Sequence, residues 1–64
     1  RRDYRWRRVI RETLLKENSE IYKRNFFQLE GVKKLIIEHE SGKRDHWQII
    51  TYIVTFELFL RDFL

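Results

Sequence analysis

The sequence predicts an all-α fold, a small bundle of about three helices whose last helix is strongly apolar. The chain has no proline and only two glycines, so few residues would interrupt a helix. Its apolar residues recur at three- and four-residue intervals in the first two predicted helices, which is the spacing of one helix face. A chain of 64 residues forms at most one domain, and its core is small. Residues 1–64 are therefore predicted to form a single small helical unit.

The first predicted helix covers residues 3–17. Five of its residues share one apolar stripe, because they recur at i, i+3, i+4, i+7 and i+8: Trp6, Val9, Ile10, Thr13 and Leu14. Most of the charged residues lie outside this stripe, so the helix is amphipathic. Asn18 and Ser19 are predicted to end it, because their short polar side chains compete for backbone hydrogen bonds. A brief turn then leads to residues 25–27.

The second predicted helix covers residues 29–40. One face carries Val32, Leu35, Ile36 and His39, and another carries Lys33, Lys34 and Glu38. Ser41 and Gly42 are predicted to end this helix. Glycine readily adopts the left-handed conformation that closes a helix and satisfies its last carbonyl groups.

The third predicted helix covers residues 45–63 and begins near Asp45, whose carboxylate can cap free backbone N–H groups. Residues 49–56 are all β-branched or aromatic, which by itself favours a strand. We favour a helix because the apolar residues do not alternate and the segment is too long for an ordinary strand. Such a helix is apolar nearly all round, with Trp47, Ile50 and Val54 on one side and Ile49, Ile53, Phe56, Leu60 and Phe63 on another. One side can pack against the first two predicted helices, and the apolar surface of the other side would have to be covered by something else.

The composition bears on the cellular location of the protein. A membrane span needs about 20 predominantly apolar residues, and Glu57, Arg61 and Asp62 interrupt the apolar segment here. The chain has no cysteine, and no apolar stretch of a signal peptide follows its Arg-rich start, so we expect a cytoplasmic protein. Because the chain has no methionine and starts at Arg1, we expect it to be a fragment or a processed product of a longer parent protein.

Residues 39–64 combine a polar turn with a defined helix ending. The turn reads His, two residues, Gly, two residues, Asp, His, and the helix closes on Phe-Glu-Leu followed by Arg and Phe. Nine residues hold these positions: His39, Gly42, Asp45, His46, Phe56, Glu57, Leu58, Arg61 and Phe63. The pattern resembles the C-terminal tail of glutamine-hydrolysing asparagine synthetases. Two tryptophans of the family tail are replaced here, one by Ile50 or Thr51 and one by Phe59.

The resemblance implies a structural role inside a larger enzyme. Asparagine synthetases use ATP and Mg²⁺ to activate aspartate and transfer to it ammonia from glutamine, and relatives of the family amidate other carboxylates. Their catalytic N-terminal cysteine and their Ser-Gly-Gly-x-Asp-Ser phosphate loop are both missing from this chain. We therefore expect no catalytic, cofactor-binding or metal-binding residue here, with ATP and Mg²⁺ bound elsewhere in the parent. The expected partner is the remainder of the parent's synthetase domain.

A metal site and a nucleotide site are less favoured readings of the polar turn. His39 and His46 lie near acidic residues, but they are seven positions apart across a helix break, with no pair of ligands one helical turn apart. We expect His39 to bond the last carbonyls of its helix instead. Residues 42–43 read Gly-Lys but lack the other glycine and the hydroxyl residue of a phosphate-binding loop.

The alternative to a synthetase fragment is a stand-alone helical binding module. Residues 1–16 hold seven basic and two acidic residues, and arginines interleaved with aromatic residues suit nucleic acid. Nucleic acid is not favoured, because Trp6 lies on the apolar stripe and a run of charge is usually a solvated face. The apolar C-terminal helix could instead bind a protein partner or a second copy of the chain.

Overall fold

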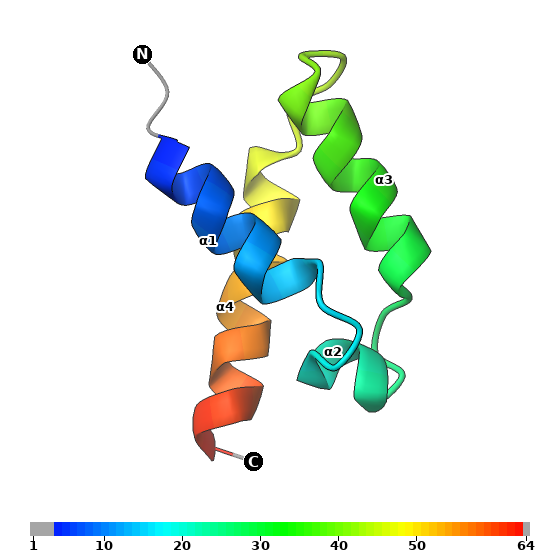
Figure 1. The fold of residues 1–64 in the computed structure, drawn as a ribbon, viewed down its shortest axis with the longest axis vertical. Coiled ribbons are helices and arrows are strands. Elements are labelled where there is room, and N and C mark those ends of the chain that lie inside the picture. The colour runs from blue at the N-terminus through cyan, green and yellow to red at the C-terminus, as the bar shows by residue number, and fades with distance from the viewer. Residues whose placement is uncertain (1–3, 64) are drawn as a thin grey trace.

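The computed structural model describes residues 4–63 and confirms the all-α prediction. Four helices and no strands occur within these residues: α1 (Tyr4–Leu14), α2 (Glu20–Lys23), α3 (Leu29–Glu40) and α4 (Trp47–Phe63). The C-terminal helix α4 is the centre of the arrangement, because α1, α2 and α3 all pack against it. Figure 1 shows α1 crossing in front of α4, α3 alongside, and α2 near the C-terminal half of α4.

The apolar core draws on all four helices, and α4 supplies the largest share. Its buried members are Ile10, Leu14, Ile21, Val32, Ile36, Ile50, Ile53, Val54 and Leu60. The predicted division of α4 into two sides is partly wrong. Ile53 and Leu60 belong to the core, whereas Ile49 and Phe63 are exposed. No helix within residues 4–63 is long and apolar enough to cross a membrane.

Helix α1 ends at Leu14, three residues before the predicted end, and its predicted start at residue 3 lies outside the described residues. The early end has a physical cause in two side chains that follow the helix. The Ser19 hydroxyl donates to the Thr13 carbonyl at 2.8 Å, and the Tyr22 hydroxyl donates to the Leu14 carbonyl at 2.5 Å. These donors satisfy carbonyls that a longer helix would otherwise have bonded.

The connection predicted as a plain turn contains the short helix α2, so that prediction was incomplete. Asn25 ends the turn with a φ of 61°, in the left-handed region that asparagine tolerates. The backbone N–H groups of Phe26 and Phe27 both donate to the Ile21 carbonyl, at 2.9 and 3.1 Å. This tight reversal directs Phe26 toward α4, where its ring and the ring of Phe56 pack edge to face with their centroids 5.1 Å apart.

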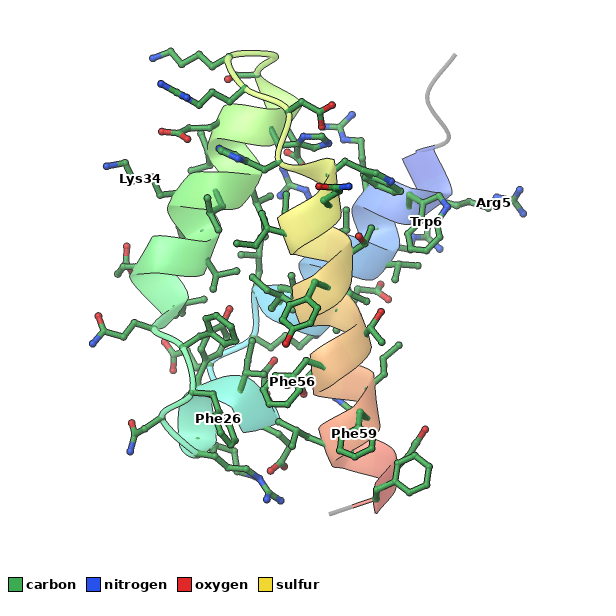
Figure 2. All side chains as sticks on the ribbon, turned by 180° about the vertical axis from the view of Figure 1, so that it is seen from behind. Arg5, Trp6, Phe26, Lys34, Phe56 and Phe59 are labelled. Atoms are coloured by element: carbon green, nitrogen blue, oxygen red, sulfur yellow. The ribbon has the colours of Figure 1, made fainter. Side chains whose placement is uncertain are left out.

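Helix α3 has the predicted bounds. Val32 and Ile36 face the core, and Lys34 points away from the rest of the molecule (Figure 2). Gly42 has a φ of 81°, as the sequence predicted for the residue that closes this helix. The N–H groups of Gly42 and Lys43 donate back to the carbonyls of His39 and Glu38, at 3.2 and 3.1 Å. This is the double hydrogen bond of a Schellman helix end.

The two glycines should respond oppositely to alanine. Gly42→Ala should lower the free energy of unfolding by about 1–2 kcal/mol, because an L-residue is strained in the left-handed region. Gly31→Ala, at the third residue of α3, should raise it by up to about 0.5–1 kcal/mol, because alanine is the better helix former and restricts the unfolded chain more than glycine does. No atom lies within 4 Å of an added Cβ at either position, so backbone conformation alone decides the sign. Urea unfolding of both variants tests this, and a change of the same sign in both would contradict it.

Candidate functional site

The nine signature residues form two groups at opposite ends of α4. Glu57 and Arg61 lie beside α2 near the C-terminal end of α4, with Phe56, Leu58 and Phe63 on the same stretch of helix. The other four residues, His39, Gly42, Asp45 and His46, lie at the connection between α3 and α4. The two groups are therefore separate sites in the fold.

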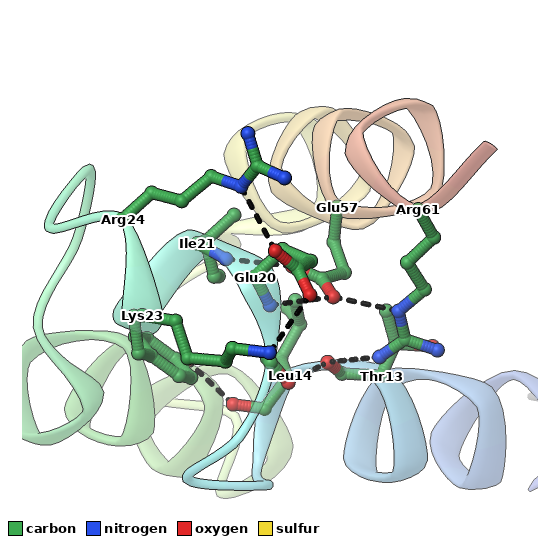
Figure 3. Close-up of polar contacts among 10 residues, drawn as sticks. Thr13, Leu14, Glu20, Ile21, Lys23, Arg24, Glu57 and Arg61 are labelled. Atoms are coloured by element: carbon green, nitrogen blue, oxygen red, sulfur yellow. Dashed lines mark hydrogen bonds and ion pairs between the residues drawn. The ribbon is translucent and has the colours of Figure 1, made fainter. Parts of the chain in front are cut away.

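Glu57 is the centre of the first group, and its side chain is completely buried, with 0% of its surface exposed. Its Oε2 accepts the backbone N–H of Glu20 at 3.0 Å, and its Oε1 accepts that of Ile21 at 2.9 Å. These are the first two amides of α2. Ser19 stands at the N-cap position but makes no side-chain capping bond, because its hydroxyl is used on α1. Glu57 thus caps α2 from another helix, as Figure 3 shows.

Arg61 completes the arrangement around the buried carboxylate. Its Nε donates to Oε2 of Glu57 at 2.6 Å, one helical turn along α4, and its Nη2 reaches the Thr13 carbonyl at 3.5 Å. The buried carboxylate therefore has three protein donors, which is the condition for burying a charge without a large penalty. Glu57 and Arg61 together join α4 to α1 and α2, and we call this pair the clamp.

The environment of the clamp also holds neighbouring groups in fixed protonation states. Burial, reinforced by the charge of Glu57, raises the pKa of Tyr22 to about 12, so its hydroxyl remains a donor to the Leu14 carbonyl. Hydrogen bonds from Arg24 and then Lys23 lower the pKa of Glu20. Burial explains the first shift and hydrogen bonds within the protein explain the second, so neither requires a substrate.

The second group shapes the corner between α3 and α4, and it is not arranged as predicted for His39. The Nδ1 atom of His39 accepts the backbone N–H of His46 at 3.0 Å, rather than the ring donating to the last carbonyls of α3. Asp45 acts as predicted, since its Oδ1 accepts the N–H of Trp47 at 3.0 Å at the start of α4. Glu38 turns inward to bond Nε2 of His46 at 2.8 Å, instead of lying with the exposed lysines.

A stripe of large apolar side chains runs along α4 outside the core, and we call it the outer stripe. Its members are Ile49, Tyr52, Phe56, Phe59 and Phe63. All are exposed except Phe56, which is half-buried. Figure 2 shows Phe56 pointing from α4 toward Phe26, with Phe59 further along α4 toward its C-terminal end. The intervals along the stripe are 3, 4, 3 and 4 residues, the spacing of a helix-packing seam. This signal was present in the sequence, but the prediction assigned Tyr52 and Phe59 to no side of the helix.

Leu58 lies apart from both the clamp and the outer stripe. It is 43% exposed, and it follows Glu57 by one residue, which places it on a different face of α4. The signature residues thus divide by role. Glu57 and Arg61 form the clamp, Phe56 and Phe63 belong to the outer stripe, and Leu58 belongs to neither group.

A hollow of about 290 Å³ lies between α1, α3 and α4, and both tryptophans line it. The rings of Trp6 and Trp47 meet edge to face, 5.6 Å apart. Glu40 also lines the hollow, and its Oε1 accepts from Arg11 at 2.6 Å and lies 3.8 Å from Arg7. Two arginines of the basic helix are therefore already paired with an acidic residue. Within the part of the chain that the structure describes, no three His, Asp or Glu side chains are grouped to hold a metal ion.

No protein family model, no curated protein and no solved structure matches this chain. A functional assignment therefore depends on the residues and contacts described above.

Proposed function

We propose that this chain is the C-terminal structural portion of an asparagine-synthetase-like, ATP-dependent amidotransferase, with no catalytic machinery of its own. In this proposal the chain packs against the remainder of a synthetase domain in the cytoplasm, and the parent binds ATP and Mg²⁺ elsewhere. The observation that carries the proposal is the outer stripe on α4. The signature pattern supplies the identity of the parent.

The outer stripe supports a packing role because its spacing is regular and four of its five members are exposed, while Phe56 already packs against Phe26 and Phe27. Five large apolar residues at alternating three- and four-residue intervals form a seam onto which another helix can pack. A small protein gains nothing from leaving such a seam in water, since each large apolar side chain loses about 1.5–3 kcal/mol of burial energy when exposed. Exposed patches of this kind commonly mark interaction sites.

The clamp supports the same proposal from inside the fold. Glu57 and Arg61 are two of the signature residues, and both are engaged in holding α4 to α1 and α2. The Glu57 carboxylate accepts hydrogen bonds from two backbone amides and a guanidinium, so its role is to stabilise the fold rather than to act on a substrate. The clamp thus keeps α4 in the orientation that presents the outer stripe.

The isolated chain should bind a hydrophobic dye through the outer stripe. Dye fluorescence should fall several-fold in the double variant Tyr52→Ser with Phe59→Ser, because both side chains are exposed members of the stripe. Leu58→Ser is the matched control, since Leu58 is exposed on another face of the same helix. A dye-silent, monodisperse wild-type chain would show that the stripe is not an interface.

The parent enzyme provides the direct test of identity. The complete reading frame that contains this segment should encode the phosphate loop and the N-terminal cysteine of the family. The purified product should release pyrophosphate from ATP only when a carboxylate substrate such as aspartate is present. A frame without these motifs, or a product without this activity, would leave the stand-alone protein-binding module as the better description of the outer stripe.

A further inference from the structure

The two histidines at the corner between α3 and α4 hold opposite hydrogen-bonding roles. His39 uses Nδ1 as an acceptor for the backbone N–H of His46, at 3.0 Å. His46 uses Nε2 to bond Oε1 of Glu38, at 2.8 Å. Together these bonds tie His46, the residue before α4, to the last turns of α3, although the two histidines are seven positions apart.

The His39 bond depends on the protonation of one atom. Nδ1 can accept an N–H only while it carries a lone pair. If Nδ1 were protonated, its N–H and the backbone N–H of His46 would point at each other and could not form a hydrogen bond. Oδ1 of Asp45 lies 3.8 Å from the same Nδ1 and could accept the new N–H. The His46 bond behaves differently, because a protonated ring still donates from Nε2 to the Glu38 carboxylate.

The surroundings of His39 include charges of both signs. Arg7 of α1 and Glu40 of α3 line the hollow on one side of the ring, and Arg44 and Asp45 line the surface on the other side. The ring of Trp47 stacks on the imidazole, with centroids 6.2 Å apart and planes at 25°. A movement of the His39 ring is therefore expected to shift Trp47, the first residue of α4.

We propose that this corner is a proton-operated latch, closed while Nδ1 of His39 accepts the His46 amide and opened when Nδ1 takes up a proton. Opening exchanges the amide bond for a His39–Asp45 ion pair and frees the N-terminal turn of α4. The bond between His46 and Glu38 remains in the open state, so the helix start loosens without leaving α3. The latch does not depend on the proposed function, because all of its parts lie within this chain.

Amide hydrogen exchange followed by NMR between pH 5 and 8 tests the latch, since histidines ordinarily change charge in this range. After correction for the intrinsic pH dependence of exchange, protection of the His46 amide should fall roughly five- to tenfold on acidification, the value of one neutral hydrogen bond. The Val32 amide is the internal reference, because it donates to the Gln28 carbonyl at the start of α3, at the opposite end of that helix from His39.

Three variants separate the latch from general loosening. His39→Asn offers a side-chain oxygen near the position of Nδ1 and cannot titrate, so protection should be high and independent of pH. His39→Phe retains an aromatic ring against Trp47 without an acceptor, so protection should be low at every pH. His46→Gln leaves His39 as the titrating residue at the corner, so the wild-type pH dependence should persist.

Acidification also reaches Glu38, but in a different range. The hydrogen bond from His46 lowers the pKa of Glu38, so the stability from this carboxylate is complete above its ordinary value of 4.5 and is lost as the pH falls below it. The window from pH 5 to 8 therefore isolates the histidines. The latch is refuted if His46 protection does not change across this window, or if His39→Asn keeps the same pH dependence as the wild type.

Discussion

Glu57→Ala should unfold much of the chain at 25 °C, with a loss of about 3–5 kcal/mol in the free energy of unfolding. A domain of this size is stable by about 3–10 kcal/mol, so the loss is a large fraction of the total. The variant leaves the amides of Glu20 and Ile21 without their acceptor at the contact between α2 and α4, and it removes the partner of the partly exposed Arg61 guanidinium. Leaving buried donors without an acceptor costs more than the net energy of the hydrogen bonds themselves.

Two comparisons identify the cause of that loss. Glu30→Ala removes a carboxylate whose side chain is 84% exposed, with only a 3.8 Å ion pair to Lys33, and should change stability by less than about 0.5 kcal/mol. Glu57→Gln keeps one acceptor oxygen but presents an NH₂ group to a backbone donor, so its loss should be intermediate. Urea unfolding followed by circular dichroism measures all three variants. Equal midpoints for Glu57→Ala and the wild type would show that the clamp does not stabilise the fold.

Leu60→Ala should cost about 2–5 kcal/mol, because it removes a side chain that is only 2% exposed and leaves a cavity in the core. Leu60 lies one turn beyond Phe56 on α4, yet it belongs to the buried core rather than to the outer stripe. The core contains residues from all four helices, so a local shift of one neighbour cannot fill the cavity that the substitution leaves.

Leu58→Ala is the matched control, because the same side chain is removed two residues earlier on the same helix. Leu58 is 43% exposed, so the expected loss is below about 1 kcal/mol. Thermal unfolding of both variants gives the comparison. Similar midpoints for Leu58→Ala and Leu60→Ala would mean that α4 is not oriented as the structure shows.

Local chemistry was sufficient to predict the helices whose ends are set by their own residues. The bounds of α3 were predicted correctly, and Gly42 adopts the left-handed conformation expected of a helix end. Asp45 caps the start of α4, although the helix begins at Trp47, two residues after the predicted start. These features depend on contacts only a few residues apart, which is why a reading of neighbouring residues finds them.

The candidate site was predicted in part. The signature identified Glu57 and Arg61 as residues of interest, but their roles depend on partners that are distant in the sequence. Glu57 lies 36 and 37 residues from the two amides that it caps. The same limit explains the missed helix α2, whose four residues are too few to show a period and whose first amides are capped by another helix.

The sequence by itself determined that this protein is helical, that its last helix carries more apolar surface than a small core can cover, and where α3 ends. Tertiary structure alone decided which apolar residues of α4 are buried, how the early end of α1 is satisfied, and which atom of His39 accepts a hydrogen bond. The physical reason is that helical periodicity records the spacing of apolar residues along one element. The choice between core and surface on an almost wholly apolar helix depends on which neighbours pack against it.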